Sequence, residues 1–291
     1  MASGALSTMT TAPVRVRLRK VPPAAGWLWI QRGFRTFWRR PAGFSGLYLF
    51  VMVCLIVSMM LPPAIALVAM TLMPLLSLGF MIATEDVLAG QPLRPTVFWT
   101  PLTMSSSARR SLLAIGLFYL LASLALVYFA DFIDGGEARR WMETLMTPRT
   151  DGKMPEMPPL SALGAAVLAF KTFGIGLVSI PLWHAPALVH WGRQGAVQAM
   201  FSSVLSIWYT RRAFLVFGLG WIAVILAFTL LTSIAVAVFG PIAISLAAMT
   251  CMVALTATFY VSAWFCFADT FEITSTTAYR ADLADANPPA P

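Results

Sequence analysis

The sequence predicts an all-α integral membrane protein, with six transmembrane helices arranged as three hairpins and amphipathic interfacial helices on the cytoplasmic face. Composition supports this first, because 59% of the 291 residues are hydrophobic and only 11% are charged. An ordinary soluble domain has about 45–50% apolar and about 25% charged residues, so these charges are too few to cover a water-exposed surface. The other two observations are a series of six long apolar runs and a concentration of basic residues on one side of them.

Each apolar run is long enough to cross the hydrocarbon core, which takes about 20 residues of helix. Only Pro62-Pro63 separates the first run from the second, and only Gly240-Pro241 separates the fifth from the sixth, so each pair predicts a tight hairpin. The third and fourth runs flank a polar loop, residues 134–160, that carries five of the chain's 12 acidic residues. The predicted spans lie in one domain, residues 26–272, at 43–61, 63–84, 111–132, 164–189, 214–239 and 242–268.

The basic residues predict the orientation of these spans. Fifteen of the 20 Lys and Arg residues fall in segments that share one side, four fall in the 134–160 loop, and Lys171 falls inside the fourth run. Lys and Arg collect on the cytoplasmic side of membrane proteins. We therefore expect both termini in the cytoplasm, as a basic tail (residues 1–25) and a C-terminal tail (residues 273–291), and the 134–160 loop in the periplasm.

An internal repeat accompanies the three hairpins. An arginine pair precedes each hairpin, and helical periodicity at residues 27–38 and 197–208 predicts amphipathic helices before the first and fifth spans, with a partial copy at 95–108. Such helices lie in the headgroup layer, where arginine binds lipid phosphate. We expect headgroup contacts, with anionic lipid as the partner, from Arg32, Arg35, Arg39, Arg40, Arg109, Arg110, Arg211 and Arg212.

The repeat has two interpretations. Duplication of one unit is the simpler, and it assigns the repeat no function. Alternatively, the polar clusters at which the second, fourth and sixth spans leave the membrane converge on a shared site, because internal repeats often bracket a central pathway. These clusters lie at residues 84–86, 184–190 and 269–272.

Several segments resemble an uncharacterised family of bacterial six-span inner-membrane proteins. They are residues 21–29 (VPPAAGWLW), Gly33-Phe34, Arg39-Arg40-Pro41, residues 185–189 (APALV) and residues 264–271 (WFCFADTF). The resemblance covers about residues 20–272 and departs from the family pattern in a longer 134–160 loop. It implies six spans in the bacterial inner membrane and carries no activity. A more distant likeness is to the membrane domains of glycerophosphodiester phosphodiesterases, although the sequence holds no catalytic domain.

Lys171 is the main candidate for a functional residue inside the membrane, because an ionisable side chain at that depth needs a partner or access to water. If the fourth span ends near Val189, Lys171 lies close to the outer face and a structural role suffices; if the span is 161–182, Lys171 lies near the middle. Neighbouring glycines would let a helix or ligand approach closely, and a proline would loosen the helix. The candidate intramembrane site is Lys171, Gly174, Gly176, Pro181 and His184.

No catalytic residue, metal site or cofactor is predicted. The sequence lacks the phosphate-binding G-x-x-x-x-G-K-[ST] pattern, the H-E-x-x-H zinc motif and the G-x-S-x-G nucleophile motif. His184 and His190 are six residues apart, which is not the i, i+4 spacing of two ligands on one helix. The three cysteines have no paired spacing and predict neither a disulfide nor a zinc site.

Three classes of function stay open at this point. The pattern favours a non-enzymatic membrane scaffold or assembly component that engages lipid or partner proteins. The alternative is a small-solute or ion transporter or channel with a midplane site near Lys171, its pathway formed by Lys171, Gly174, Gly176, Pro74 and Pro181. An intramembrane enzyme has the least support. The expected partners are anionic membrane lipids, with protein partners or a second copy of the chain as alternatives. Nucleic acid is not expected, because a basic tail beside a membrane binds anionic lipid first.

Overall fold

The structure, a computed structural model, describes residues 14–146 and 159–275. Its elements in chain order are β1 (Val14–Leu18), α1 (Ala25–Phe37), α2 (Pro41–Met60), α3 (Pro63–Leu88), the 3-10 helix η1 (Pro95–Phe98), α4 (Thr100–Thr103), α5 (Ser106–Asp134), α6 (Glu137–Met146), α7 (Ala162–Ser179), the 3-10 helix η2 (Ile180–Leu182), α8 (Ala185–His190), α9 (Ala196–Tyr209), α10 (Arg211–Phe239), α11 (Pro241–Thr270) and β2 (Phe271–Ser275).

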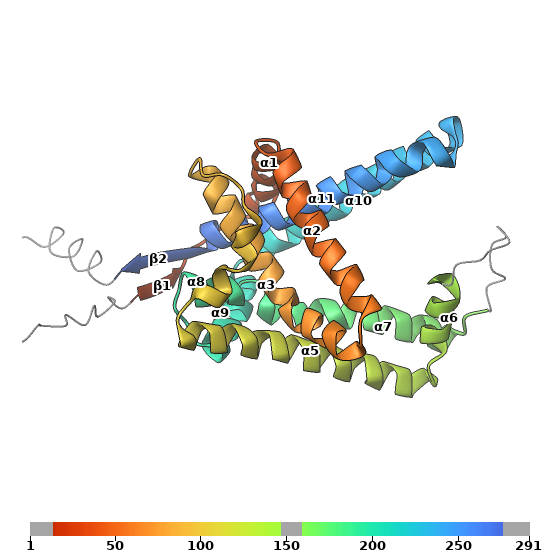
Figure 1. The fold of residues 1–291 in the computed structure, drawn as a ribbon, viewed down its shortest axis with the longest axis horizontal. Helices are drawn as coiled ribbons and strands as arrows, with labels where there is room; N and C mark the ends of the chain where they lie inside the picture. Colours follow the sequence, from red (N-terminus) through yellow and green to blue (C-terminus); the bar gives the residue numbers. More distant parts are fainter. Residues whose placement is uncertain (1–13, 147–158, 276–291) are drawn as a thin grey trace, which may run out of the picture.

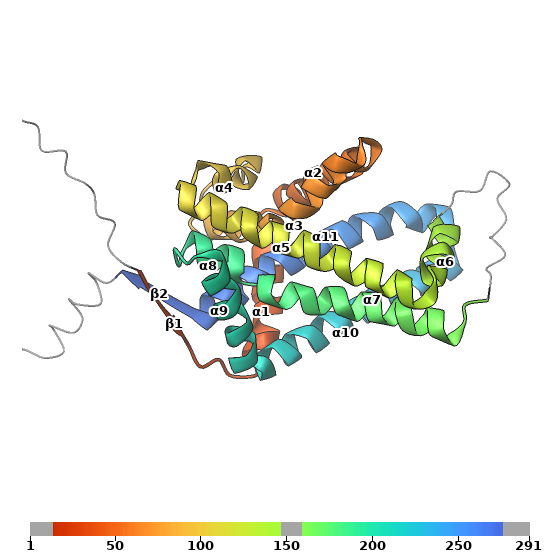
Figure 2. The same cartoon turned by 90° about the horizontal axis from the view of Figure 1, so that it is seen from below.

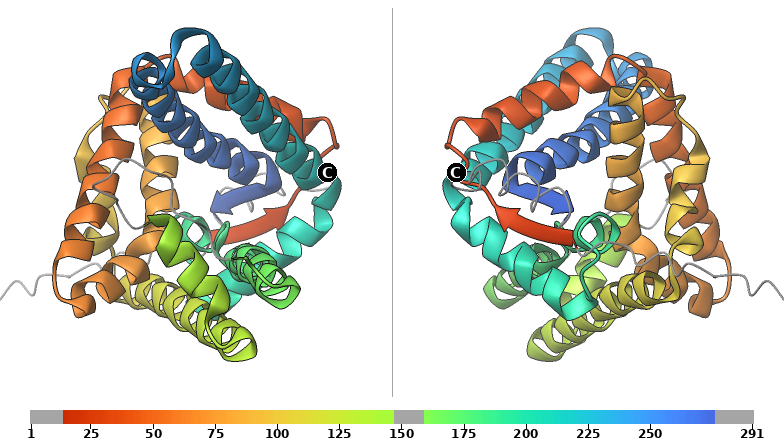
Figure 3. Two further views of the ribbon diagram at one scale, coloured as in Figure 1. Left: turned by 90° about the vertical axis from the view of Figure 1, so that its right-hand side faces the viewer. Right: turned by 90° about the vertical axis from the view of Figure 1, so that its left-hand side faces the viewer.

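The predicted fold class is confirmed. Within the described residues, six helical segments are long and apolar enough to cross a membrane. They form three hairpins: α2 with α3, α5 with α7, and α10 with α11. The α5–α7 and α10–α11 hairpins diverge from the end that carries the strands, and α2 and α3 cross at a steeper angle (Figures 1 and 2). Viewed along the long axis, the hairpins surround the strands on three sides (Figure 3).

Proline, glycine and serine mark the ends of the membrane helices. Pro63 is the first residue of α3, where its missing N–H costs no helical hydrogen bond. Gly240, between α10 and α11, has a φ of 81°, a conformation that glycine adopts without strain. The hydroxyl groups of Ser105 and Ser161 accept hydrogen bonds from backbone N–H groups in the first turns of α5 and α7.

The fourth span, predicted at residues 164–189 with Pro181 loosening its helix, is broken within its length. Helix α7 ends at Ser179, the 3-10 turn η2 follows, and α8 then continues to His190. Pro181, inside that turn, explains the break, because proline has no N–H to donate and its ring collides with the preceding helical turn.

The helix α1 occupies the residues of the first predicted interfacial helix, and one face of it packs on protein. Trp29 is fully buried against α10 and α11. Gly26 permits this contact, because a Cβ atom there would collide with the carbonyl oxygen of Ala213 in α10. Asp269, near the end of α11, accepts hydrogen bonds from Trp29 Nε1 (2.8 Å) and Arg32 Nη1 (3.0 Å). One carboxylate thus fastens α1 to the third hairpin.

The helix α9 occupies the second predicted interfacial segment. Its buried residues are small or polar, including Ser203 and Ser206. Its large apolar side chains face outward, since Val197, Phe201 and Trp208 are all exposed. This arrangement fits a helix that lies in the headgroup layer with its apolar face toward lipid.

Two short strands, which were not predicted from the sequence, lie where the two predicted tails join the helical domain. β1 pairs antiparallel with β2, so that Val14 lies opposite Ser275 and Leu18 opposite Phe271. Alternate residues of β1, including Val16, pack against the main hydrophobic core. The sheet therefore brings parts of the predicted N- and C-terminal tails together on one side of the molecule.

The loop predicted at residues 134–160 begins with a helix, α6, while its residues 147–158 lie outside the described part of the chain. Glu137, the first residue of α6, accepts hydrogen bonds from the backbone N–H (2.7 Å) and the hydroxyl (2.6 Å) of Ser161. These two bonds lower the pKa of Glu137 below its usual value. They also join the start of α6 to the start of α7.

Side-chain packing is concentrated at the end of the molecule that carries the strands. In α10 the buried residues are Ala213, Phe217 and Trp221, all within the first three turns. In α11 the buried hydrophobic residues with described side chains begin at Ala257 and continue toward β2. The hairpins are therefore joined mainly at one end, which is the end of both predicted cytoplasmic tails.

Candidate functional site

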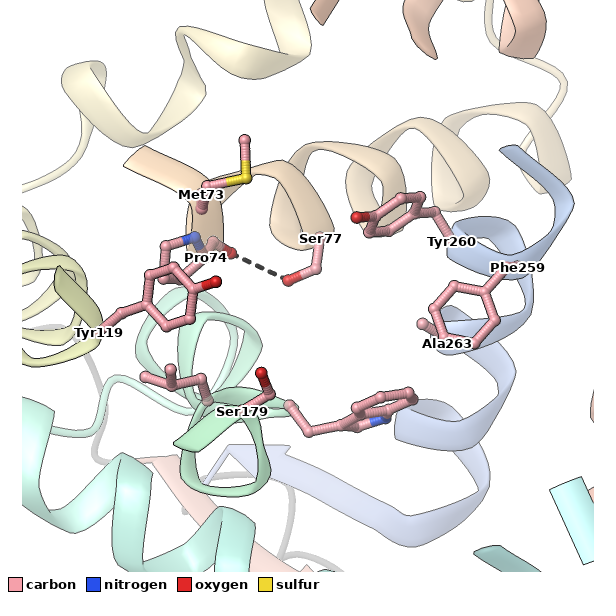
Figure 4. A pocket seen from close by; sticks show the side chains of 10 residues that line it. Met73, Pro74, Ser77, Tyr119, Ser179, Phe259, Tyr260 and Ala263 are labelled. Carbon is pink, nitrogen blue, oxygen red and sulfur yellow. Dashed lines mark hydrogen bonds between the residues drawn. The ribbon is translucent and has the colours of Figure 1, made fainter. Parts of the chain in front are cut away.

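A cavity of about 240 Å³ lies where the three hairpins meet (Figure 4). Its walls come from α3, α5, the broken end of the fourth span and α11. No charged side chain is among the described residues that line it, and most of the lining is apolar or aromatic. The lining residues are Met73, Pro74, Ser77, Tyr119, Ser179, Leu182, Trp183, Phe259, Tyr260 and Ala263.

Four hydroxyl groups and the indole N–H of Trp183, which has no hydrogen-bond partner among the described residues, are the polar side-chain groups of this lining. Ser77 and Ser179 donate theirs to backbone carbonyls of their own helices, each at 2.9 Å, and keep oxygen lone pairs for an incoming donor. Within residues 14–146 and 159–275, the hydroxyls of Tyr119 and Tyr260 form no hydrogen bond. Figure 4 shows these two hydroxyls facing the hollow from α5 and α11.

Where the fourth span breaks, beside the cavity, a side chain of another helix satisfies backbone groups that have lost their helical hydrogen bonds. The Ser203 hydroxyl of α9 donates to the carbonyl oxygen of Ile180 and accepts from the backbone N–H of His184, both at 3.1 Å. Irregular backbone is tolerated at membrane depth only where neighbouring groups satisfy it in this way. The turn is therefore stabilised by the fold itself, and the Ile180 carbonyl and the His184 N–H need no ligand as a hydrogen-bond partner.

Lys171 lies between two helices and away from the cavity. Its ammonium group pairs with the carboxylate of Asp131 in α5, and Arg139 of α6 approaches the same carboxylate at 3.7 Å. The side chains of Lys171 and Asp131 are only 14% and 18% exposed. Asp131 lies one turn before the end of α5, so the long lysine side chain reaches toward the outer end of the hairpin. The pair joins α5 to α7.

Gly174, Gly176, Pro181 and His184 are also absent from the cavity lining, and of the residues predicted for a transport pathway Pro74 lies in it. A Cβ atom at Gly174 would collide with Leu126 of α5, so this glycine serves helix packing, whereas Gly176 faces open space. Pro181 breaks the span beside the cavity. Thus Lys171, Gly174 and Pro181 each acquire a structural explanation, and the role of the five residues as a functional site stays a prediction.

His184 is enclosed by aromatic rings. The side chain is fully buried, and neither ring nitrogen has a hydrogen-bond partner among the described residues. The rings of Phe214, Phe267 and Phe271 lie 5.4–5.8 Å from it, centroid to centroid. Burying an imidazole without a partner costs free energy, which the surrounding packing must offset.

The polar ends of the second, fourth and sixth spans come together at the strand-bearing end. Thr84, His184 and Thr270 are all fully buried there. Trp191, which follows α8, lies against Glu85 of α3 and packs on Trp264 of α11 with 5.0 Å between ring centroids. This convergence forms the densely packed hub from which the hairpins extend.

The eight arginines expected at lipid headgroups are all exposed. Arg32 bonds Asp269, and the Arg211 guanidinium lies 5.0 Å above the centre of the Trp208 ring. The remaining six are at or near the helix ends where the hairpins begin: Arg35, Arg39, Arg40, Arg109, Arg110 and Arg212. Their contact with lipid stays a prediction.

Sequence reasoning did not identify Asp131, Tyr119 or Tyr260. The signal for Asp131 was its place at the end of the third run, opposite a lysine in the next antiparallel span. The signal for the two tyrosines was their position deep inside apolar runs, since tyrosine in membrane helices is enriched at the two interfaces.

Comparison with known proteins supports the membrane assignment. No protein-family model and no solved structure matches the chain. A probable inner membrane protein of Burkholderia thailandensis is 28% identical over 214 residues, which cover 72% of this chain and 77% of the relative. Six membrane-length apolar helices lie within the described residues, so the chain is a multi-pass membrane protein. It is similar to this probable inner membrane protein, whose name states no activity.

The Lys171–Asp131 pair predicts a double-mutant result. Replacing Lys171 with Met leaves a shielded carboxylate without its closest partner, so we expect the free energy of unfolding to fall by about 3 kcal/mol. The double variant Lys171→Met/Asp131→Leu removes both charges and should recover most of the loss. Thermal unfolding in detergent micelles measures both effects. Equal stability of the single variant and the wild type would show that the pair is not structural.

Proposed function

We propose that this chain is a non-enzymatic scaffold of the inner membrane. In this role it holds anionic lipid at its cytoplasmic end and membrane-embedded protein partners along the outer halves of its hairpins. The observation that carries the proposal is that the spans are packed together mainly at one end.

The outer half of α10 illustrates this property. Its buried residues stop at Trp221, and beyond that point Leu226 and Leu230 are 63% and 62% exposed. In a bilayer such faces contact either lipid or another transmembrane helix, and helix association there depends on fit and not on a hydrophobic driving force. A rigid hub with separate apolar arms supports the binding of several membrane partners at once.

A basic groove at the hub supports the lipid part of the proposal. Its volume is about 460 Å³, and it lies between the β1–α1 connection and the corner joining α9 to α10. Lys20, Arg211 and Arg212 line it together with Trp208, which is 68% exposed. Clustered cations at the membrane surface attract anionic lipid, and tryptophan favours the same headgroup layer.

The state of Lys171 favours a scaffold over a transporter. A midplane transport site would need the lysine ammonium open to a solute, whereas here it is paired with Asp131 and lies outside the cavity between the hairpins. The distant likeness to the membrane domains of glycerophosphodiester phosphodiesterases stays a sequence-based expectation and adds no catalytic group to the proposal.

We further propose that both termini are cytoplasmic. The excess of basic residues in the segments on that side supports this orientation. The pairing of β1 with β2 supports a common side for the two tails.

Photo-crosslinking in cells tests the partner-binding faces. A photoreactive phenylalanine analogue at Leu230 should give protein adducts of discrete mass, because this position faces outward. The same group at Phe217, which is 3% exposed on the same helix, should give none. Adducts to lipid alone at Leu230 and at other outer positions of the hairpins would contradict the protein-scaffold role.

Lipid retention tests the basic groove. Each basic residue near an anionic surface contributes about 1 kcal/mol, so Arg211→Gln/Arg212→Gln should weaken binding of an anionic phospholipid roughly thirtyfold. The charge-preserving control Arg211→Lys/Arg212→Lys should bind nearly as well as the wild type. Native mass spectrometry of protein titrated with phosphatidylglycerol measures the difference. Unchanged retention in the glutamine variant would remove the groove from the proposal.

Reporter fusions test the orientation. A fusion at residue 150 should report the periplasm, and fusions at residues 100, 200 and 285 should report the cytoplasm, as expected from the distribution of basic residues. Alkaline phosphatase and green fluorescent protein, which are active on opposite sides, make the measurement reciprocal. The reverse pattern would overturn the orientation.

A further inference from the structure

We propose that the cavity at the junction of the three hairpins binds an uncharged, lipid-soluble molecule with a carbonyl oxygen, of the chemical class represented by quinones. This site does not depend on the scaffold role, which concerns the outer faces of the hairpins and the basic groove. The two proposals can therefore fail separately.

The depth of the cavity is the first step. Tyr119 lies 13 residues after Ser106, and Tyr260 lies 10 residues before Thr270. At 1.5 Å per residue these positions are about 20 Å and about 15 Å from the hub ends of their helices. Since the hydrocarbon core is about 30 Å thick, both side chains lie well inside it. Tyrosine at this depth is outside the interfacial belts in which it is usually found.

The unpaired hydroxyls are the second step. A hydroxyl group in hydrocarbon without a hydrogen-bond partner costs free energy. The hydroxyls of Tyr119 and Tyr260 have no such partner within the described residues, and both face the hollow (Figure 4). The two nearby serine hydroxyls already donate to backbone carbonyls. Among the described lining residues, the side-chain donors without a partner are thus the two phenolic hydroxyls and the buried indole N–H of Trp183. The two hydroxyls face the hollow and call for an oxygen acceptor from the occupant.

The lining restricts the class of molecule that can supply this oxygen. None of the described residues that line the cavity carries a charge to neutralise a charged headgroup. Phospholipid ester groups lie at the headgroup boundary, about 15 Å from the middle of the bilayer, which is shallower than the tyrosine hydroxyls. The acceptor therefore belongs to a neutral molecule dissolved in the hydrocarbon core.

The aromatic walls of the cavity favour a flat ring over an open chain. The volume of about 240 Å³ corresponds to roughly eight water-sized groups at about 30 Å³ each. Aromatic walls stack well on a planar ring, and Phe259 and Tyr260 supply them from α11. Trp183 forms a third aromatic wall, and its ring is positioned by an edge-on contact with Phe259, at 5.8 Å between ring centroids.

Ligand-dependent thermal unfolding of the full-length protein in detergent tests the site. Decylubiquinone is the ring probe, and palmitic acid methyl ester is the open-chain carbonyl probe. We expect decylubiquinone to raise the unfolding temperature in a saturable manner, because a ligand that binds the folded state stabilises it. The variant Tyr119→Phe/Tyr260→Phe loses both donors and keeps both rings, so its apparent affinity should fall about tenfold.

Two further variants complete the experiment. Tyr128→Phe, on the same helix as Tyr119 but 70% exposed, should bind decylubiquinone like the wild type. Ala263→Phe fills the cavity and should abolish binding; if it fails to fold, the tyrosine pair still decides the outcome. Stabilisation by the methyl ester that depends on both tyrosines would keep the carbonyl site and reassign its source to acyl chains. No stabilisation by either probe, or equal stabilisation of the wild type and the Tyr119/Tyr260 variant, would overturn the proposal.

Discussion

Transmembrane helices gain little by burying apolar surface against one another, because lipid is as apolar as their side chains. The three hairpins of this protein therefore depend on close contacts and polar anchors, and these are concentrated at one end. The Asp269 carboxylate holds Trp29 and Arg32 of α1, the Ser203 hydroxyl holds both sides of the broken fourth span, and Gly26 lets α1 approach the backbone of α10. The strands β1 and β2 then close this end of the molecule.

Anchoring at one end gives the molecule two regions with different properties. The hub is densely packed by aromatic side chains such as Trp191, Trp264 and Phe267, whose rings contact one another. The outer halves of the hairpins are left to lipid and partners, and only the α5–α7 hairpin carries a charged link there, between Asp131 and Lys171, among the described residues. The cavity lies between these two regions, where the helices begin to diverge.

Much of the fold could be predicted because lipid imposes simple rules on sequence. Long apolar runs predicted the six spans, and Pro62-Pro63 and Gly240-Pro241 predicted two of the hairpin turns, since paired helix-breaking residues between two membrane-length runs mark a turn. Pro181 predicted a loosened helix in the fourth span, but the geometry of the break could not be predicted, because the turn there depends on Ser203, a residue of another helix. The strands were missed because their pairing joins residues more than 250 positions apart.

The sequence by itself indicated that lipid surrounds much of this protein, how many apolar spans it has and in which segments its basic residues are concentrated. Those properties follow from composition and from the order of residues along the chain, because partitioning between water and lipid depends on the local sequence of each segment. Only the tertiary structure decided the partners of individual side chains: Asp131 for Lys171, Asp269 for Arg32, and a shared hollow for Tyr119 and Tyr260. The physical reason is that each of these pairings depends on the distance between different helices. In lipid that distance is set by side-chain packing between the helices, which the apolar periodicity of a single helix does not predict.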